Sequence, residues 1–325
     1  MSEVILSIKD LKTYFPVHKS KGQMVYVKAV DQVNLDINQG EIMGLVGESG
    51  SGKSTIAYTV MGMYKPMGGE IIFQGQYINV LNKKRPFSLK KDLQIIFQDP
   101  GSSLNGQQNI RQILELPLKV HKIVPKEELS GRVAELLQMV ELSPAYMYKT
   151  PGAIGGGERQ MVSIARALAC NPKFVILDEP TSALDVSIQA KIINMLLKLQ
   201  QKRQLTYLFI THDLSLMRNI ATRVAIMYLG KVCEIAKTGD FFKNPLHPYT
   251  NMLLSSIPVI SDEEEELHPK KILSSGEIPS PVNIPPGCSF HTRCPLRMEI
   301  CSQIDPVMQE MTPDHFVRCH ACQGG

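Results

Sequence analysis

The stretch Gly47-Glu-Ser-Gly-Ser-Gly-Lys-Ser-Thr55 fills every fixed position of the pattern G-x-x-x-x-G-K-[ST], the P-loop pattern of phosphate-binding loops. The apolar run Ile42–Val46 before it predicts a buried strand, and the residues after Thr55 predict a helix. This strand–loop–helix context distinguishes a phosphate-binding loop from a chance match.

The chemistry of phosphate binding explains the residues of this loop. Glycines let the backbone curl around a phosphate with its N–H groups inward, and the following helix adds the positive end of its dipole. Lys53 is expected to reach the β- and γ-phosphates of a nucleotide, and the Ser54 hydroxyl to hold Mg²⁺. The expected nucleotide contacts of the loop are Gly47, Ser49, Gly50, Ser51, Gly52, Lys53, Ser54 and Thr55.

The composition is that of an ordinary globular protein with one or two domains. The chain has 325 residues, of which 43% are hydrophobic and 20% charged, and its net charge of +4 is too small to imply nucleic acid. No uncharged apolar run approaches the roughly 18 residues that span a bilayer. Ser2 and Glu3 lead directly into the strand-like run Val4–Ile8, so we expect no signal peptide and a cytosolic protein that reaches a membrane through a partner.

The pattern along the chain predicts a cassette followed by an extension. Residues 1–100 are β-rich, residues about 101–170 are helical, and strands alternate with helices from Lys173 to about Tyr228, which favours a parallel sheet. The acidic run Glu263–Glu266 reads as a solvated linker, and several prolines follow it. We therefore place one domain at 1–260 and an extension at 261–325.

Two segments add carboxylates and a second anion site. The apolar run Phe174–Leu177 ends in Asp178 and Glu179, as in a Walker B element, where Asp178 would hold Mg²⁺ through water and Glu179 would orient or deprotonate the attacking water. The glycines Gly155–Gly157 and Glu158 precede a helical run, and a glycine-rich helix start binds anions. If Lys53 holds the phosphates of one nucleotide, this second site cannot serve the same nucleotide.

Two single polar residues follow apolar runs. Gln98 ends the run Leu93–Phe97, and His212 follows the expected strand Leu205–Ile210. A histidine at the carboxyl end of a parallel strand lies where ligands bind in open α/β sheets.

These motifs, in this order, resemble the ATPase subunit of ATP-binding-cassette (ABC) transporters over roughly residues 4–255. The resemblance implies an α/β P-loop NTPase with a RecA-like core, an antiparallel β subdomain and a helical subdomain at about 101–170, plus a small irregular Cys-rich extension. It also implies two cassettes packed head to tail, with each ATP between one P-loop and the partner's signature. In this chain the signature is Ile154-Gly-Gly-Gly-Glu158.

The resemblance assigns roles to four further residues. Gln98 would touch Mg²⁺ and sense the membrane subunit, and His212 would contact the γ-phosphate. Asp185 would lie across the dimer interface, as would the signature residues Gly155, Gly156, Gly157 and Glu158. Phe15 is our candidate for stacking on adenine, and neighbouring Tyr14 is the alternative.

Two C-terminal segments narrow the resemblance. Asn244–Pro258 and Gly287–Pro295 resemble segments of oligopeptide and dipeptide permease ATPases, a family that includes nickel importers. Tyr14–Val17 and Gln94–Pro100 are most similar to the second of the two ATPase subunits in such permeases. Those importers combine two different cassettes, two membrane-spanning permease subunits and an external solute-binding protein.

The signature departs from the family pattern L-S-G-G-Q, because Gly155 stands in place of the serine and Ile154 and Glu158 are milder changes. A hydrogen bond to a charged group contributes roughly 1.5–3 kcal/mol, so its loss from the transition state would slow hydrolysis about 10- to 100-fold. In a head-to-tail heterodimer this signature serves the partner's P-loop. We expect a slow partner site, and the alternative is that both sites work.

Five of the seven cysteines lie near the C-terminus, with the spacing Cys288-x5-Cys294-x6-Cys301-x17-Cys319-x2-Cys322. In a cytosolic chain such a cluster favours metal over disulfides. Thiolates suit a structural Zn²⁺ or an iron–sulfur cluster, and the spacing matches neither the common zinc-ribbon nor the ferredoxin pattern. The resemblance favours a 4Fe–4S cluster on Cys288, Cys294, Cys301 and Cys319. Zinc, unligated thiols, and Cys322 or His320 as a ligand remain alternatives.

Three functions are compatible with these motifs. The leading one is the ATP-hydrolysing motor of a membrane importer for oligopeptides or dipeptides, with nickel or another small solute as an alternative cargo. The second is a non-transport ABC ATPase of DNA repair or translation, which usually joins two cassettes or carries long coiled-coil insertions that this chain lacks. The third is a module that holds ATP without hydrolysing it, and the intact Lys53, Asp178, Glu179 and His212 argue against it.

Overall fold

The computed structural model describes residues 3–20, 23–257 and 276–323. The chain divides into two compact units. Unit 1 comprises Met1–Glu3, Asn38–Gly40 and Val80–Phe209, and unit 2 comprises Val4–Ile37, Glu41–Asn79 and Ile210–Gly325. Within the described ranges, no helix combines the length and the apolar character needed to cross a membrane.

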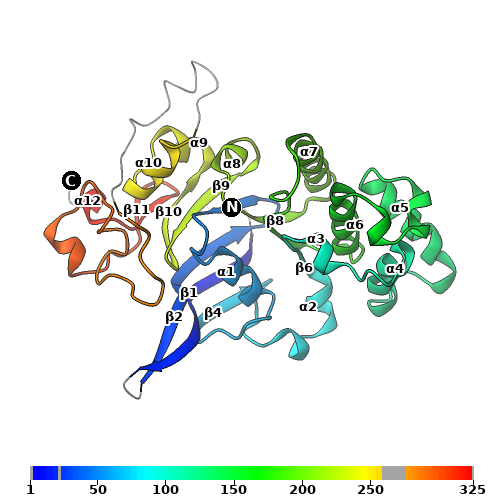
Figure 1. Cartoon of the computed structure of the whole chain (residues 1–325), viewed down its shortest axis with the longest axis horizontal. Coiled ribbons are helices and arrows are strands. Elements are labelled where there is room, and N and C mark those ends of the chain that lie inside the picture. Colours follow the sequence, from blue (N-terminus) through cyan, green and yellow to red (C-terminus); the bar gives the residue numbers. More distant parts are fainter. Residues whose placement is uncertain (1–2, 21–22, 258–275, 324–325) are drawn as a thin grey trace. The chain divides into compact units, whose positions relative to one another are not determined.

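Unit 1 is mainly helical. Helices α4, α5 and α6 pack against one another, and α6 also packs against strand β6 (green and cyan in Figure 1). The elements of unit 1 are η1 (Asn82–Lys84), α2 (Phe87–Asp92), β6 (Leu93–Ile96), α3 (Pro100–Ser103), α4 (Ile110–Val120), η2 (Lys126–Glu128), α5 (Leu129–Met139), η3 (Pro144–Tyr148), η4 (Pro151–Ala153), α6 (Gly156–Leu168), β7 (Phe174–Asp178) and α7 (Val186–Arg203). Strand β8 (Thr206–Thr211) crosses the division into unit 2.

Local sequence signals set the ends of the unit 1 elements. Asn109 and Gln112 form a capping box at the start of α4, in which each side chain accepts a hydrogen bond from the other residue's backbone N–H. Strands β6 and β7 pair in parallel from Leu93 opposite Phe174 onward. The buried strand β7 confirms the strand expected before Asp178 and Glu179.

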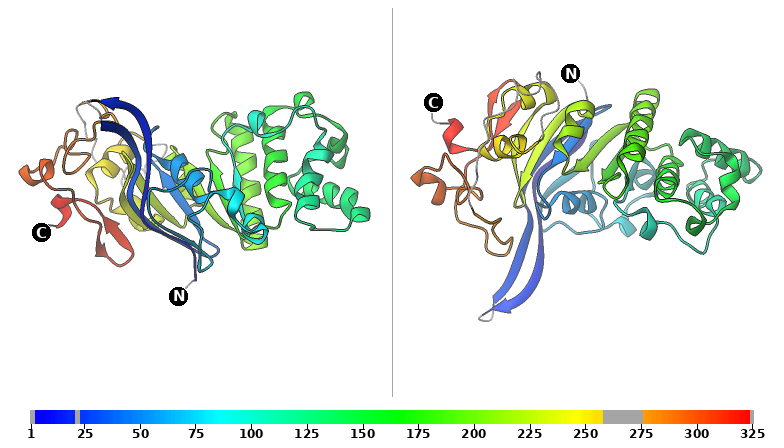
Figure 2. Two further views of the ribbon diagram at one scale, coloured as in Figure 1. Left: turned by 90° about the horizontal axis from the view of Figure 1, so that it is seen from below. Right: turned by 45° about the horizontal axis from the view of Figure 1, so that its top comes forward.

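Unit 2 contains two sheets. The first has the strand order β2–β1–β4–β5, and Figure 2 shows β1 and β2 side by side as a long twisted ribbon. The second follows the order β11–β12–β10–β9–β3, in which β3 and β9 are parallel and the other pairs antiparallel. The elements are β1 (Val4–Ser20), β2 (Gln23–Asn38), β3 (Ile42–Val46), α1 (Lys53–Val60), β4 (Gly68–Phe73), β5 (Gln76–Tyr77), α8 (Leu214–Ile220), β9 (Arg223–Tyr228), β10 (Lys231–Lys237), α9 (Thr238–Lys243), α10 (Pro248–Leu254), η5 (Glu299–Ser302), β11 (Gln309–Thr312), β12 (His315–Val317) and α12 (His320–Gln323).

The strand expected before the loop is β3, and all five of its residues are buried. A strand covered on both faces reads as a continuous apolar run, and this is why its sequence does not alternate. Helix α8 packs on β3, and a Cβ atom added at Gly44 would lie 2.7 Å from the sulfur of Met217. The glycine therefore admits the helix closely against the sheet.

The end of the chain is more regular than the small, irregular extension that we expected. Residues 276–298, all of them described, contain neither helix nor strand, but η5, β11, β12 and α12 follow them. Strand β12 pairs with β10, with Val317 opposite Glu234, so the C-terminal residues extend the sheet that contains β3. The boundary expected near residue 260 and the acidic run Glu263–Glu266 lie outside the described residues.

A buried carboxylate fastens the C-terminal strands. Glu234 of β10 has no exposed surface, and its two oxygens accept hydrogen bonds from the N–H groups of Leu246 (2.8 Å) and His247 (2.9 Å). His315 Nε2 of β12 lies 2.7 Å from Glu234 Oε1. A buried charge is stable only when it is paired and hydrogen-bonded, so Glu234 links β10, the start of α10 and β12.

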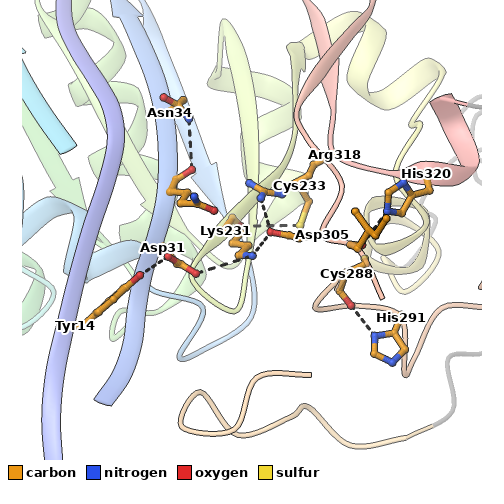
Figure 3. A network of polar contacts seen from close by, with 12 residues as sticks. Tyr14, Asp31, Asn34, Lys231, Cys233, Cys288, His291, Asp305, Arg318 and His320 are labelled. Carbon is orange, nitrogen blue, oxygen red and sulfur yellow. Dashed lines mark hydrogen bonds and ion pairs between the residues drawn. The ribbon is translucent and has the colours of Figure 1, made fainter. Parts of the chain in front are cut away.

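A second polar network joins the C-terminal segment to β1 and β2. Figure 3 shows Lys231 at its centre, bound to Asp305 and 4.0 Å from an oxygen of Asp31. The Tyr14 hydroxyl donates to Asp31 at 2.5 Å, and Arg318 donates to Asp305 at 2.7 Å. Because Lys231 is 9% exposed, these contacts are shielded from water, and they tether residues near both ends of the chain.

His247 makes the stability of unit 2 depend on pH. Its side chain accepts a hydrogen bond from the N–H of Tyr249 at the start of α10. Burial lowers its pKa to about 4 from 6.5, and the nearby charge of Glu234 offsets only part of this effect. The unfolded chain therefore binds a proton more readily than the folded chain, so this contribution to stability is complete above pH 6.5 and is lost as the pH falls toward 4.

Because the unfolded chain binds a proton at His247 more readily, we expect the free energy of unfolding to fall by about 2 kcal/mol from pH 7 to pH 5. The His247→Asn variant keeps a side chain that can cap α10 but does not titrate. Its free energy of unfolding should therefore fall by about 2 kcal/mol less than that of the wild type over the same pH range. Denaturant unfolding of both proteins at the two pH values measures the difference. An equal decline in both would contradict the assignment.

Candidate nucleotide site

The P-loop lies entirely in unit 2, between β3 and α1. Gly50 and Gly52 have φ angles of 77° and 107°, which favour glycine. A Cβ atom added at Gly47 would lie 2.2 Å from the Met227 carbonyl oxygen, and one at Gly52 would lie 2.1 Å from that of Ala29. The loop therefore needs glycine both for its curvature and for its close packing against neighbouring backbone.

The start of α1 suits an anion. Its N-cap is Gly52, which has no side chain to satisfy the first N–H groups, and no acidic residue lies in the first turn. Such a helix start attracts a phosphate through its N–H groups and its dipole. The hydroxyl of Ser51 is buried and has no hydrogen-bond partner among the described residues.

Lys53 is 5% exposed, and its ammonium group donates to the carbonyl oxygens of Gly47 (2.7 Å) and Glu48 (2.9 Å). The positive charge is thus held over the loop by backbone oxygens. This places Lys53 in the loop that the sequence predicts to bind phosphate.

Glu48 is a member of this site that the motif does not reveal, because it fills a variable position of the pattern. Its N–H donates to the Tyr249 hydroxyl at 3.2 Å. Its carboxylate accepts from Tyr249 (3.2 Å) and from Arg293 (3.1 Å). Tyr249 and Arg293, which follow Glu48 by 201 and 245 positions, therefore hold one side of the loop.

Gln98, Asp178 and Glu179 lie in unit 1, and His212 lies in unit 2. Gln98 Nε2 donates to Glu179 Oε2 at 2.9 Å, so the structure brings the glutamine and the expected catalytic carboxylate together. Asp178 ends β7 with no exposed surface. Glu179 has a φ angle of 46°, a sparsely populated conformation for a residue with a side chain, and such strain is typical of functional positions.

The signature residues begin α6. Gly155 is the N-cap, and the N–H of Gly155 donates a hydrogen bond to the Glu158 carboxylate at 2.7 Å. The Tyr146 hydroxyl donates to the other oxygen of Glu158 and, as the largest cause, lowers the pKa of that carboxyl. The helix start therefore carries a fixed negative charge where the family pattern has a neutral glutamine.

Three motif segments of unit 1 line one small cavity of about 120 Å³. These segments are residues 98–101 after β6, the first turn and a half of α6, and the turn after Glu179. The lining residues are Gln98, Asp99, Pro100, Gly101, Gly156, Arg159, Gln160, Pro180, Ala183 and Leu184. The sequence motifs that follow β6 and β7 are thus neighbours in space.

Two further expected site residues lie at helix starts. Asp185 is exposed and caps α7, because its Oδ1 accepts from the N–H of Ile188 (3.0 Å) and the Ser187 hydroxyl (2.7 Å); these bonds lower the pKa of its carboxyl. His212 is exposed between β8 and Asp213, which caps α8. Their roles at a subunit interface and at a γ-phosphate stay predictions.

The two candidates for stacking on adenine have different surroundings. The Tyr14 hydroxyl donates to Asp31, and the Lys28 ammonium lies 5.9 Å from the centre of the Tyr14 ring. The Phe15 ring meets Tyr64 edge-on, with 5.0 Å between centroids. The Tyr14 hydroxyl belongs to the network of Figure 3, and Phe15 stays our candidate for stacking on adenine, with Tyr14 as the alternative.

The sequence matches two described families. One is the ABC transporter family, over residues 30–182, and the other is "Oligopeptide/dipeptide transporter, C-terminal region", over residues 233–301. The fold resembles a dimeric, post-hydrolysis structure of the ATP-binding cassette MJ0796 bound to ADP and Pi. The TM-score is 0.63 and the identity 31%, over 72% of this chain and 98% of that one.

Curated relatives match along nearly the whole chain. The oligopeptide transport ATP-binding protein AppF of Bacillus subtilis is 46% identical over 98% of this chain and 97% of its own length. OppF of Salmonella typhimurium, another oligopeptide transport ATP-binding protein, is 40% identical over 98% and 96%. The chain therefore belongs to the ABC transporter family, among the ATPase subunits of its oligopeptide group.

Proposed function

We propose that this chain is the ATP-hydrolysing motor subunit of a membrane importer for oligopeptides or dipeptides. The observation that carries the proposal is the combination of a complete P-loop geometry around Lys53 with near full-length similarity to oligopeptide transport ATP-binding proteins. The names of these relatives favour peptides over nickel and favour transport over DNA repair or translation.

Within this function we propose the following division of labour. Lys53 and the P-loop N–H groups bind the β- and γ-phosphates, Phe15 stacks on adenine, and His212 contacts the γ-phosphate. Glu179 orients the attacking water and takes its proton, and its hydrogen bond from Gln98 holds the carboxylate in place. This bond also gives Gln98 a direct route by which a membrane subunit can influence Glu179.

Mg²⁺ fits the oxygen donors that these motifs provide. The hydroxyl of Ser54, the side-chain oxygen of Gln98 and the carboxylate of Asp178 are hard ligands of the kind that Mg²⁺ prefers. Bound Mg²⁺ would neutralise charge on the phosphates during hydrolysis.

We further propose that the chain works beside a second, different ABC ATPase subunit. The two cassettes would associate with two membrane-spanning permease subunits at the cytoplasmic face of the membrane, and an external solute-binding protein would deliver the cargo. Gly155–Glu158 and Asp185 would then face the partner's nucleotide. Gly155, Asp185 and Val186 are exposed, as residues of such an interface would be before the partner binds.

We expect the Glu179→Gln variant to keep ATP binding and to lose hydrolysis by about 10²- to 10⁴-fold, because an amide cannot accept the proton of the attacking water. Phosphate release and nucleotide binding, both measured in the assembled importer, separate the two steps. Peptide uptake into vesicles should fall with hydrolysis. Hydrolysis that survives this substitution would exclude the proposed role of Glu179.

The start of α6 supports a slow site on the partner. Gly155 lacks the hydroxyl of the family pattern, and the Glu158 charge would lie near the γ-phosphate of the partner's ATP. Two negative charges repel each other, so the Glu158 carboxylate would destabilise a phosphate bound near it. Both changes weaken the same site, while Lys53 and Glu179 in this chain keep their expected chemistry.

We expect Gly155→Ser to raise the total ATPase rate of the assembled complex up to about twofold, because the slow site would speed up about 10-fold or more while the site on Lys53 and Glu179 keeps its rate. The serine fits, because a Cβ atom at Gly155 would meet only Glu158 Oε2, at 3.5 Å. Gly152→Ser is the matched control, since that glycine is exposed and has open space around it. An unchanged rate in Gly155→Ser would favour two working sites.

We also propose that the residues beyond 260 form an extension that holds a metal centre, with a 4Fe–4S cluster on Cys288, Cys294, Cys301 and Cys319 and zinc as the alternative. No group of three or more His, Cys, Asp or Glu side chains in the described residues is arranged to hold a metal ion. Burial, with the neighbouring thiols, raises the pKa of Cys288 and of Cys294 to about 11, so a bound metal would have to displace the protons of these thiols. The support for the proposal is the donor set itself, because four cysteine sulfurs suit an iron–sulfur cluster or zinc.

We expect anaerobically purified protein to contain about four iron and four sulfide ions per chain, which corresponds to one 4Fe–4S cluster. Iron, acid-labile sulfide and zinc analysis, together with an absorption spectrum, measure this content. Zinc alone would make the centre a structural clip, and protein free of both metals under reducing, oxygen-free conditions would refute the metal proposal. The ATPase proposal stands apart from this outcome.

A further inference from the structure

Two residues far from the motif in sequence, Tyr249 of α10 and Arg293, hold the P-loop through Glu48. Glu48 lies between Gly47 and Ser49, and each of its polar groups is engaged. Its carbonyl oxygen accepts from Lys53, its N–H donates to Tyr249, and its carboxylate accepts from Tyr249 and Arg293. Three of these four contacts come from residues beyond position 248.

Arg293 is built into this position. It is 9% exposed, and its guanidinium carbon lies 5.8 Å from the ring centres of both Tyr228 and Phe290. One Nη1 atom lies 3.1 Å from Glu48 Oε2 and 3.5 Å from the Tyr228 hydroxyl. A shielded, charge-assisted contact of this kind is worth more than an exposed ion pair.

An aromatic cluster fixes the guanidinium. Phe290 is fully buried, and its centroid lies 5.3 Å from those of both Tyr228 and Tyr249, which themselves are 4.7 Å apart. Tyr228 directly follows Met227, whose carbonyl oxygen abuts Gly47. Arg293 therefore reaches the loop by two routes, through the Glu48 carboxylate and through the end of β9.

These contacts act on the atoms that prepare the loop for phosphate. The Glu48 carbonyl oxygen is one of the two backbone acceptors that hold the Lys53 ammonium. The Glu48 N–H, held by Tyr249, belongs to the same peptide group as the Gly47 carbonyl oxygen, which is the other acceptor of Lys53. The carboxylate contacts restrain Glu48 itself, which connects this peptide group to the one that carries the Glu48 carbonyl. A loop ordered before ATP arrives loses less conformational entropy on binding.

We propose that Arg293 is a positioning residue for ATP: through Glu48 it orders the P-loop and so raises nucleotide affinity. The stretch from Cys288 to Cys322, which contains Arg293 and five cysteines, thereby contributes to the nucleotide site. This inference rests on the proposed function, because it takes ATP as the ligand of the loop.

The test measures binding of a fluorescent ATP analogue with Mg²⁺ to the full chain. Arg293→Met keeps the bulk of the side chain and removes its charge, and we expect the affinity to fall about tenfold, or about 1.4 kcal/mol. Arg293→Lys restores the charge and should recover most of the affinity. In the assembled importer Arg293→Met should raise KM for ATP and leave kcat within about twofold, because Arg293 orders the loop before binding.

A double-mutant cycle isolates the route through Glu48. Glu48→Gln should lower the affinity to a similar extent, and the double variant with Arg293→Met should be little weaker than either single variant. Additive losses would show that Arg293 does not act through Glu48 and would overturn the proposal.

Two control variants separate positioning from general stability. Arg297→Met changes an exposed arginine of the same segment and should leave the affinity unchanged. Arg318→Met breaks the contact with Asp305, which loosens the segment without touching the loop, and should also leave it unchanged. A loss in Arg318→Met equal to that in Arg293→Met would overturn the proposal, as would wild-type affinity in Arg293→Met.

The wild-type chain and Lys53→Met distinguish failure of this inference from failure of the proposed function. Wild-type binding that Lys53→Met abolishes supports ATP as the ligand, and then an unaffected Arg293→Met variant refutes only the positioning role. Wild-type protein that binds no ATP would refute both.

Discussion

Close packing of the P-loop against two backbone carbonyl groups is the constraint on which unit 2 depends. Gly47 and Gly52 have no room for a Cβ atom beside the carbonyl oxygens of Met227 and Ala29. This packing joins the end of β9 and the strand β2 to the start of α1. The glycines of the motif therefore serve both the packing of unit 2 and the binding of phosphate. A larger residue at either position would disturb both.

The local parts of this structure could be predicted from the sequence. The strand before the loop, the helix after it and the strand that ends at Asp178 follow from short apolar runs beside glycine or acidic residues. The ATPase motifs of unit 1 were also predicted, and the structure adds that Gln98 bonds to Glu179. Such signals suffice because each needs only the residues within a few positions of it.

The contacts that cross long stretches of chain could not be predicted. Glu48 occupies a position where the motif allows any residue, and nothing near Arg293 in the sequence indicates a partner 245 positions away. Likewise, the sequence shows that Glu158 replaces glutamine, but only the structure shows Tyr146 bound to it. The irregular backbone of residues 276–298 was expected from the sequence. Strand β12 was not expected, because its pairing with β10 and the contact of His315 with the buried Glu234 join residues about 80 positions apart.

The position of β12 has a consequence for how the protein is made. Unit 2 combines residues from the first quarter of the chain with residues from position 210 onward, and the partner of Glu234, His315, lies 81 positions further along the chain. During synthesis the ribosome would release the loop and β3 long before β9, β10 and β12 emerge to complete their sheet. Pairings so distant in sequence form slowly. Until β12 emerges, the nascent chain therefore carries an unpaired sheet edge, and such edges make folding intermediates prone to aggregation.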